Sequence, residues 1–498
     1  MSAPVAASAS LNLRMSPDSP VEKARHRIRQ LVWVYFWLLL IEGALRKWIL
    51  PSFSNELLLI RDPVMLAIYY YTIPARVFPR NFWATSLWLI AALSVVGSFL
   101  LSTFNLLAGF VPIVPLLEIA AYGVRTNFLH LPLIFVIASV FDEEDVKKFG
   151  WWTIVLMIPM GLLMVAQFQA SPDSFINRTA GLGEAEQLTA GGGKIRPPGT
   201  FSFISGSVFY MTFAAAFLIY GALTKTVYKN WLLILSGAAL VVSVVVSGSR
   251  ACVASVLIVV LAVIVIFLVR PRAVNRIVLT GLVVVVVAFL LSFLPIFKEG
   301  AHVLSDRFTD SAEAADTTIT KGMISRVFGD FTEGLGNLDK FPMFGYGIGI
   351  GTNVGGRILV GRPAFLLAES EWSRVLGESG PILGLTFLLW RTLFTLQLLL
   401  LSLSALKRYN ILPILLFSSG FVLLLEGQLG QPTTLGFATL VNGLCLAATR
   451  PRAPDDPAVT PSQIDQSAEK SLPRRSVYAN RLHGPGIGAE HTNGSADR

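Results

Sequence analysis

Apolar stretches long enough to cross a membrane recur along this chain from residue 31 to residue 449. A bilayer has a hydrocarbon core about 30 Å thick, which a helix of roughly 20 apolar residues can span. Hydrophobic residues make up 53% of the 498 positions and charged residues only 14%, whereas soluble domains carry about 25% charged residues. The sequence therefore predicts an all-α polytopic integral membrane protein.

The positions of the basic residues set the orientation of the predicted helices, because cytoplasmic loops carry an excess of Lys and Arg. The N-terminal segment ends in a basic cluster, and further basic groups follow every second span, so both chain ends are expected in the cytoplasm. We expect about 12 transmembrane helices, near residues 31–49, 57–74, 83–103, 126–141, 151–169, 200–222, 231–248, 251–269, 277–296, 378–402, 411–427 and 433–449.

These spans divide the chain into regions. Residues 1–30 form a cytoplasmic segment, 31–296 carry spans 1–9, 297–377 form a large exported loop, 378–449 carry spans 10–12, and 450–498 form a cytoplasmic tail whose composition predicts disorder. Residues 105–124 are apolar but contain Pro112 and Pro115. We expect a re-entrant or interfacial element there, which a membrane tolerates only where protein covers its backbone.

Charge and cysteine content exclude several classes of protein. The net charge of +9 does not indicate nucleic-acid binding, because the basic residues cluster in short segments beside predicted helices. Cys252 and Cys445 lie within apolar runs. A disulfide framework is therefore not expected, and neither cysteine has a nearby second ligand that would suggest a metal site.

Arg250 is the most informative cation in the predicted membrane region. It follows Ser247-Gly248-Ser249, a polar break between the apolar runs 231–246 and 251–269, which predicts a tight turn between two transmembrane helices. A cation placed toward the membrane centre costs about 2.5–3.5 kcal/mol on insertion scales, so it rarely lies there without a partner. The partner is either an internal carboxylate or an anionic substrate.

The predicted topology gathers other cations on the exported side. Arginine bonds two phosphate oxygens at once, so such a cluster suits a substrate with a phosphate-like head group and a lipid tail. The alternatives are that Arg46 reaches to the interface, that Arg61 and Asp62 form an internal ion pair, and that Arg196 is a solvated loop charge. The candidate binding residues are Arg46, Arg125, Arg196, Arg326 and Arg374, and Arg357 and Arg362 lie in the same loop as the last two.

Carboxylates cluster where the large loop meets the tenth span. On a helix, Glu371, Arg374 and Glu378 lie close to one face through spacings of three and four residues. Carboxylates at a membrane boundary can be partly desolvated, which suits a general base. The alternative is a structural ladder of Glu–Arg–Glu ion pairs. Glu369 lies in the same stretch.

Three further patterns have structural interpretations. The run Gly345-Tyr346-Gly347-Ile348-Gly349-Ile350-Gly351 lacks the spacing of a dinucleotide fingerprint, and predicts a loop with close backbone approach or unusual φ. His130 lies in an apolar span, which favours a core histidine. Asn177-Arg178-Thr179 is a short match to a glycosylation sequon.

Together these features resemble the O-antigen ligase and O-antigen polymerase family of bacterial polytopic membrane glycosyltransferases. The resemblance covers residues 30–450 and rests on the many-span topology, the Ser-Arg turn at 249–250, the large late loop and Glu378-x-Gly380 before the next helix. Phe344–Gly349 is similar to the family's entry into that region. The segments Glu42–Trp48 and Arg61–Pro63 look like a polymerase-type subgroup.

The resemblance implies an enzyme of the bacterial inner membrane that needs no cofactor and no metal. Its substrate would be an oligosaccharide on an undecaprenyl-pyrophosphate carrier at the periplasmic face. A hydroxyl of the acceptor sugar would attack the anomeric carbon and displace the lipid pyrophosphate, whose developing charge the exported arginines would neutralise. Arg250 would match the family's Ser-Arg arginine. Other polysaccharide-assembly proteins could act as partners.

The chain departs from the family at one position. Members often carry His-Asn nine residues before the glutamate of Glu-x-Gly, where this chain has Glu369 and Ser370. If the histidine acts as a base elsewhere, Glu369 or Glu371 must take its place. The catalytic candidates are Arg250, Glu369, Glu371 and Glu378.

Other functions stay open at this point. A ligase that moves finished polymer to a lipid or protein acceptor is the nearest variant. A transporter or flippase would suit a helix broken at Pro112 and Pro115, but the chain has no visible internal repeat, and its charges gather on one face instead of near the midplane. A non-catalytic scaffold is the third class.

Overall fold

Within the residues that it describes, the computed structural model of this chain is helical apart from one short antiparallel hairpin. The described residues are 19–98, 112–180, 189–191, 193–224, 227–269, 274–314, 329, 331–336, 338–362 and 364–450. The predicted disordered tail from residue 451 onward, the candidate Arg326 and residues 105–111 lie outside them.

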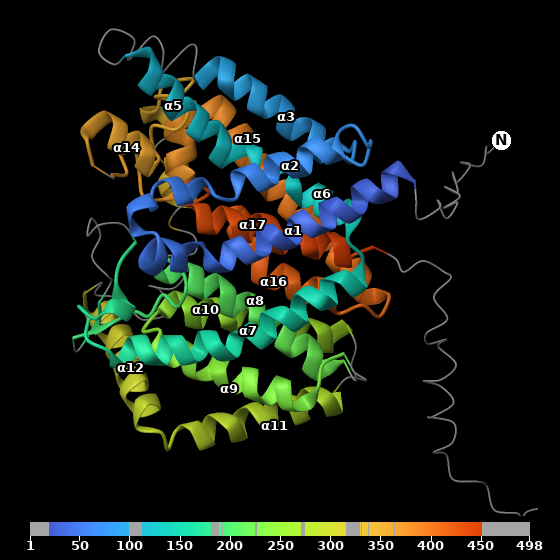
Figure 1. The fold of residues 1–498 in the computed structure, drawn as a ribbon, viewed down its shortest axis with the longest axis vertical. Coiled ribbons are helices and arrows are strands. Elements are labelled where there is room, and N and C mark those ends of the chain that lie inside the picture. Colours follow the sequence, from blue (N-terminus) through green and yellow to red (C-terminus); the bar gives the residue numbers. More distant parts are fainter. Residues whose placement is uncertain are drawn as a thin grey trace, which may run out of the picture. The chain divides into compact units, whose positions relative to one another are not determined.

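The elements follow one another along the chain as shown in Figure 1. The α-helices are α1 (Pro20–Ala44), α2 (Asp62–Thr72), α3 (Phe82–Ser94), α5 (Ile113–Val124), α6 (Leu133–Val140), α7 (Glu143–Gln169), α8 (Ile204–Leu223), α9 (Asn230–Val246), α10 (Arg250–Val269), α11 (Val274–Leu291), α12 (Pro295–Ala314), α14 (Asn353–Val360), α15 (Glu371–Lys407), α16 (Leu412–Leu425) and α17 (Pro432–Ala448). Two π-helical stretches, η1 (Leu45–Ile49) and η5 (Arg125–Leu129), extend α1 and α5, and strands β1 (Thr189–Gly191) and β2 (Lys194–Ile195) form the hairpin.

Six described helical stretches are long and apolar enough to cross a membrane. A bent pair, Thr280–Leu291 with Pro295–Thr309, raises the number to seven if it forms one span. The chain is therefore a multi-pass helical membrane protein, as its composition predicts. The six stretches are Pro20–Ile49, Ile113–Val140, Glu143–Gln169, Ile204–Leu223, Arg250–Val269 and Glu371–Lys407; shorter apolar helices cover Phe82–Ser98, Asn230–Val246, Leu412–Leu425 and Pro432–Ala448.

The structure differs from the predicted boundary between an interfacial element ending at residue 124 and a span starting at 126. Ile113–Val140 is one candidate span, in which α5 continues through η5 and a turn into α6. The prolines mark its start, because Pro112 precedes the helix and Pro115 lies in its first turn, where the backbone N–H has no helical partner to lose. Residues 113–124 are thus continuous with the helix that the prediction started at residue 126, and the interfacial element stays a prediction.

Hydrogen bonds define one end of the helical bundle, which we call the basic end. Arg25 and Arg29 near the start of α1 donate to the carbonyls of Ser139 and Val140 at the end of α6. At the same end, Arg408 donates to the Thr449 carbonyl after α17, and Asn410 donates to Glu143 of α7.

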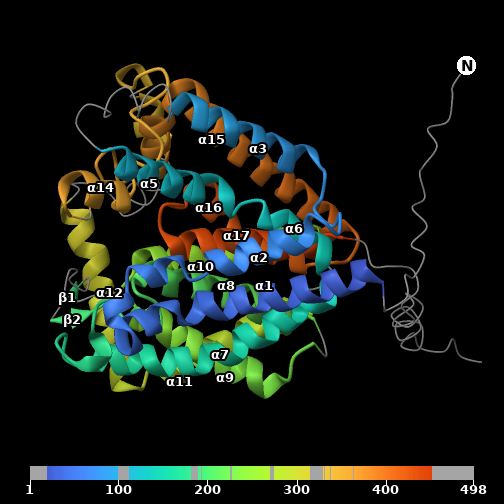
Figure 2. The same ribbon diagram turned by 45° about the horizontal axis from the view of Figure 1, so that its top comes forward.

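The opposite end, which we call the loop-rich end, contains the described parts of residues 45–61, 170–203, 345–370 and 426–431. Figures 1 and 2 both place α12 and α14 on the left, away from the start of α1 on the right.

Small residues allow the helices to approach one another closely. A side chain at Gly161 of α7 would meet Ala239 of α9, and one at Gly443 of α17 would meet Ile137 of α6. Helices in membranes associate through such small residues, because lipid supplies no hydrophobic driving force between them. The core built this way fixes the positions of the buried charges described next.

Candidate functional site

Helix α15 doubles back on itself at Gly380. Glu371 and Arg391 are 20 positions apart, which corresponds to about 30 Å along a straight helix, but Nη1 of Arg391 lies 2.7 Å from Oε1 of Glu371. Gly380 has φ 74° and ψ 175°, and Pro381 follows it. Gly384 beyond the turn packs against Leu376 before it. The element is a helical hairpin with a short arm, 371–379, and a long arm, 381–407.

The glycine-rich run caps the short arm of this hairpin. The carbonyls of Gly377 and Glu378 have no helical donor, since the helix ends at Gly380 and a proline follows. The backbone N–H of Tyr346 lies 2.7 Å from the first carbonyl, and that of Gly347 lies 3.1 Å from the second. Gly345 has φ 74°, and a Cβ there would lie 2.4 Å from the Glu378 carbonyl oxygen. The predicted close approach and unusual φ are confirmed.

Glu371 is the centre of a buried group of ion pairs on α15. Its carboxylate accepts from Arg374 through both oxygens, at 2.9 and 3.0 Å, and from Arg391 at 2.7 Å. Arg391 also donates to the carbonyls of Leu424 and Gly427, at and beyond the end of α16. The side chain of Glu371 is 0% exposed. The predicted shared face is confirmed for Glu371 and Arg374.

Glu378 completes the ladder and links it to other elements. Its Oε2 accepts from Arg374 at 2.8 Å and from the Asn127 amide at 3.3 Å, and its Oε1 accepts from the backbone N–H of Gly351 at 3.0 Å. Each of the two carboxylate oxygens of Glu371 and of Glu378 thus accepts at least one hydrogen bond. This geometry matches the ion-pair alternative, because a general base needs a lone pair that the substrate can reach. A catalytic role for either glutamate stays a prediction.

The π-helical stretch η5 carries the next group of charges. Arg125 donates two hydrogen bonds to Asp62 at the start of α2. Its Nε donates to Oδ2, and its Nη2 donates to Oδ1 at 2.9 Å. Nη2 also donates to the Leu58 carbonyl at 3.2 Å. The third nitrogen, Nη1, is buried and has no hydrogen-bond partner among the described residues. Only 6% of Arg125 is exposed.

A chain of buried side chains continues from Asp62. Nε2 of His130 lies 2.9 Å from Asp62 Oδ1, and its Nδ1 lies 3.1 Å from the Tyr35 hydroxyl. Arg61 donates to that hydroxyl at 3.3 Å and to Glu42 at 3.0 Å. Arg61 and Asp62 therefore pair with Glu42 and Arg125 instead of with each other.

Arg46, Tyr122, Arg125 and Arg357 meet at the loop-rich end, and we call this group the arginine site. Tyr122 interacts electrostatically with Arg125 and Arg46 and also with the carboxylates of Asp62 and Glu42 that pair with them, and the Arg125 guanidinium lies 5.2 Å from the Tyr122 ring centroid. Arg357 of α14 and Arg46 repel one another electrostatically. Three cations from separate elements thus lie within electrostatic range of this region, together with the carboxylates of Glu42 and Asp62, and a buried N–H of Arg125 has no partner among the described residues. That arrangement suits a phosphate or similar oxyanion.

Arg46 is fixed by the loops of this end. It donates to the Ser54 carbonyl at 2.8 Å and to the Ser202 hydroxyl at 3.0 Å, and lies 3.8 Å from Glu42. Its neighbour Lys47 is buried and donates to the Gly199 carbonyl at 2.6 Å. The side chain of Arg46 is 13% exposed. This fixed, mostly buried position favours the binding interpretation of Arg46 over the alternative that it reaches to the membrane interface.

Other candidates lie apart from the arginine site in the described contacts. Arg250 is the first residue of α10, half-buried beside a turn at Gly248 that packs near Ala190 of β1. Arg196 follows β2 and donates to the Thr189 carbonyl across the hairpin. Glu369 is exposed, and its carbonyl accepts from Gln428.

The sequon at Asn177 is blocked by its own packing. Its amide nitrogen donates to the carbonyls of Gln167 and Ser171, and the residue is 2% exposed. Modification at this nitrogen would require these contacts to break.

Several residues of the buried network pair with partners that are distant in the sequence. His130 is buried as expected for a core histidine, but it also pairs with Asp62. Tyr35 and Asn127 gave no signal, because their partners lie 95 and 251 positions away, and the partner of Arg391 lies 20 positions away. An arginine in the middle of an apolar stretch was the one available hint for Arg391, since such charges are costly unless paired.

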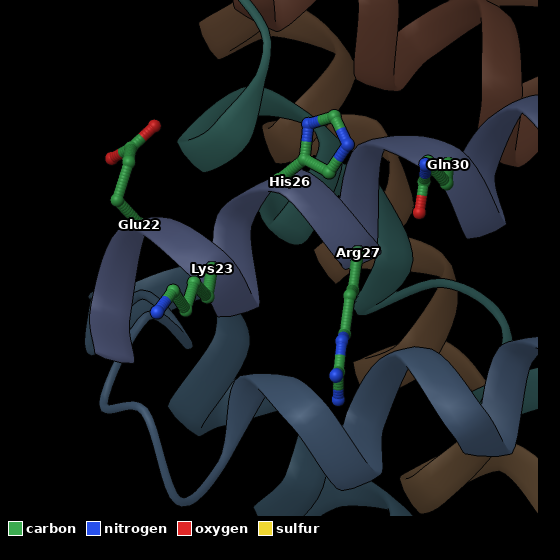
Figure 3. A pocket seen from close by; sticks show the side chains of 5 residues that line it. All are labelled: Glu22, Lys23, His26, Arg27 and Gln30. Atoms are coloured by element: carbon green, nitrogen blue, oxygen red, sulfur yellow. The ribbon is translucent and has the colours of Figure 1, made fainter. Parts of the chain in front are cut away.

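A surface hollow lies at the other end of α1. It is lined by Glu22, Lys23, His26, Arg27 and Gln30, and Figure 3 shows Arg27 extending toward the neighbouring helix. Arg27 lies over the Tyr71 ring at 5.3 Å. The hollow belongs to the basic end and is separate from the buried network. No group of histidine, cysteine and acidic side chains in the described part of the chain could hold a metal ion.

Searches against protein families, curated proteins and solved structures found no match to this chain. The chemistry of the site therefore has to be argued from its own residues.

Proposed function

We propose that this chain is a bacterial inner-membrane glycosyltransferase that polymerises oligosaccharide repeat units carried on undecaprenyl pyrophosphate. The observation that carries the proposal is the arginine site. Arg46, Arg125 and Arg357 come from three elements, and a buried N–H of Arg125 lacks a partner among the described residues. Ionisable groups inside membrane proteins are expensive and usually functional. A pyrophosphate on a lipid would reach such a site sideways from the bilayer.

We also propose that the chain crosses the membrane twelve times. The shorter apolar helices α3, α9, α16 and α17, together with α2 and α11, would supply the crossings beyond the long helices. Successive turns alternate between the two ends of the bundle: Asn410 after α15 lies at the basic end, and Gly430 before α17 lies beside Tyr122 at the other. The positive-inside rule then places the basic end in the cytoplasm and the arginine site at the exported face.

In this proposal the reaction is a displacement at the anomeric carbon. The acceptor hydroxyl gives its proton to a base and forms the new C–O bond, the bond to the pyrophosphate breaks, and the electron pair leaves on the pyrophosphate oxygen. Preorganised donors stabilise such developing charge because they need not reorient during the reaction. Arg46, Arg125 and Arg357 would act on the leaving group.

Arg250 is the second candidate for this electrostatic role. It opens α10, where a cation is disfavoured by the helix dipole. The position therefore suits a role in anion binding better than a role in stabilising the helix. Glu369, which is exposed at the same end, is the accessible candidate for the base.

The direct test is polymer formation by the purified full-length protein. Incubation with undecaprenyl-pyrophosphate oligosaccharide should give carrier-linked ladders on a gel. Arg125→Ala should lower the rate roughly 100- to 1000-fold, the usual effect of removing one preorganised donor. Arg250→Ala should abolish long chains while the protein stays in the membrane.

Lys194→Ala is the matched control, because Lys194 is a cation of the same end that pairs with Glu299 at 3.0 Å. Ladders of normal length from Arg125→Ala would overturn the role of the arginine site. A wild-type protein that forms no ladder, and instead moves polymer onto a lipid or protein acceptor, would be a ligase.

One observation favours a transporter as a second candidate. The span Ile113–Val140 is interrupted by a π-helical stretch and a turn, and charged residues gather there, as in the discontinuous helices of transporters. Flipping of lipid-linked sugar by the protein in liposomes, without polymer, would support this function instead.

A further inference from the structure

We infer that Tyr35, His130 and Asp62 form a hydrogen-bond relay that holds Arg125 with its Nη1 facing the arginine site. His130 and Tyr35 are then positioning residues, which act on the bound oxyanion only through Asp62 and Arg125. The inference rests on the proposed pyrophosphate substrate for the identity of the ligand. It adds residues from α1 and the η5–α6 turn that the proposed reaction does not use.

The end groups of the relay determine which atom donates and which accepts in each of its hydrogen bonds. Arg61 can only donate to the Tyr35 oxygen, at 3.3 Å, and an ionised Asp62 can only accept from His130, at 2.9 Å. When His130 is neutral, its Nε2 carries the proton toward Asp62, and the Tyr35 hydroxyl donates to Nδ1 at 3.1 Å. For a neutral ring, these two end groups allow only this tautomer. A second ring proton would leave the Tyr35 hydroxyl facing two donors.

The groups around His130 agree with this assignment. Tyr35 comes from α1, Asp62 from α2, and Arg125 from η5, so three elements hold the two ends of the relay around the buried ring. Asp62 is already paired with Arg125, so the ring is not needed to neutralise it. What His130 adds is a fixed direction for the carboxylate.

Fixing the carboxylate fixes the arginine. Asp62 occupies two nitrogens of the Arg125 guanidinium, and the Leu58 carbonyl accepts from one of the same two. Because the guanidinium is planar, Nη1 has no rotational freedom left once these bonds are made. It is the nitrogen that a ligand can still use; it is buried, and Cζ of the same guanidinium lies 5.2 Å from the Tyr122 ring centroid. Preorganisation of this kind improves affinity by removing the cost of ordering a side chain on binding.

A binding experiment on the full-length protein in lipid nanodiscs tests the relay. The probe is undecaprenyl pyrophosphate, with undecaprenol as the uncharged comparison. Tyr35→Phe removes one hydroxyl from the relay and should weaken binding of the pyrophosphate roughly three- to tenfold, the effect of one net hydrogen bond. It should leave binding of undecaprenol unchanged. His130→Gln, which keeps a donor for Asp62, should retain more affinity than His130→Phe.

The decisive measurement is a double-mutant cycle. In an Arg125→Ala background, where Arg46 and Arg357 still attract the probe, Tyr35→Phe should have no further effect. The relay would be overturned if Tyr35→Phe lowered the affinity equally in the wild-type and Arg125→Ala backgrounds, or if it lowered the affinity in neither. If binding to Arg125→Ala is too weak to measure, Arg125→Lys serves as the reference, because lysine keeps the charge but lacks the planar fork.

Tyr210→Phe is the matched control. This variant also loses a buried hydrogen bond of a tyrosine hydroxyl, the one of 2.7 Å to the Thr153 carbonyl, but the bond lies between α7 and α8, outside the relay. The affinity of the Tyr210→Phe protein for the probe should equal that of the wild type. The relay and the proposed enzyme can fail separately. If the double-mutant cycle supports the relay but the wild-type protein forms no polymer, the relay stands and the proposed enzyme activity is overturned. If the wild-type protein forms polymer but the double-mutant cycle fails, the enzyme activity stands and the relay is overturned.

Discussion

Glu371 is the single residue whose loss should disturb the protein most. Two buried arginines, Arg374 and Arg391, share its carboxylate. Glu371→Gln would leave them without their common counter-charge, and breaking one partner of a buried pair typically costs about 3–5 kcal/mol. We therefore expect a large loss of unfolding free energy, measured by denaturation with sodium dodecyl sulfate in mixed micelles.

Glu369→Gln is the control for that experiment. Glu369 is exposed and lies two positions away from Glu371. Its substitution should change the unfolding free energy by less than about 0.5 kcal/mol, as surface changes usually do. Similar stability in both variants would contradict the structural role assigned to Glu371. Loss of ladders in Glu369→Gln alone would instead support the exposed glutamate as the base.

At the residue scale, the sequence predicted the contacts that are local and missed those that are not. The spacing of Glu371, Arg374 and Glu378 along a helix sufficed to place them together. Nothing in the spacing connects Asp62 with His130, which is 68 positions away, or Asn127 with Glu378, which is 251 away. Such pairs depend on tertiary packing, which hydropathy and periodicity do not encode.

At the scale of elements, the α15 hairpin and the glycine-rich loop form one unit. The sequence indicated that residues 345–351 need unusual backbone angles, but not that their partner is the end of a helical arm 31 positions later, where Tyr346 meets Gly377 and Gly347 meets Glu378. The predicted tenth span began at residue 378, because apolar composition does not reveal a reversal of the chain. The spanning arm begins after Gly380, whose positive φ permits the turn.

Two glycine substitutions distinguish the cost of a left-handed backbone conformation from the cost of steric overlap with the hairpin. Gly345 and Gly361 have nearly equal angles, φ 74° and 76°, but a Cβ at Gly361 would meet nothing within 4 Å. Gly361→Ala should therefore cost only the penalty of a left-handed conformation, about 1–2 kcal/mol. Gly345→Ala should cost a further 1–3 kcal/mol or so through steric overlap with the Glu378 carbonyl.

The measurement is again unfolding in mixed micelles, with the two variants compared directly. Equal losses would mean that the loop does not press against the hairpin as described. A larger loss for Gly345→Ala would tie the stability of α15 to the loop before it.

At the scale of the whole molecule, hydropathy predicted the multi-pass class correctly. Pro112 and Pro115 suggested an interruption, whereas in the structure they lie at the start of the candidate span Ile113–Val140. The order of the helices follows from the apolar runs. How they pack does not, because the small residues that let α7 meet α9 also occur elsewhere in the chain.

The proposed orientation predicts a labelling pattern. Cysteine placed at Glu369 should react with a membrane-impermeant maleimide in spheroplasts, since the loop-rich end is expected outside. Cysteine at Tyr409, which is 82% exposed at the basic end, should react only after the membrane is opened. The native cysteines, Cys252 and Cys445, are buried and should give little background. Labelling of both sites in intact spheroplasts would contradict the twelve-span topology.

The charges of the α15 hairpin also bear on how the protein is made. Glu371, Arg374, Glu378 and Arg391 lie within one stretch of chain and are paired with one another, so their formal charges cancel. A helix that carries two unpaired arginines would resist release from the insertion machinery into lipid. The folded-back hairpin can instead enter the bilayer as an electrically neutral unit, before helices from earlier in the chain have assembled around it.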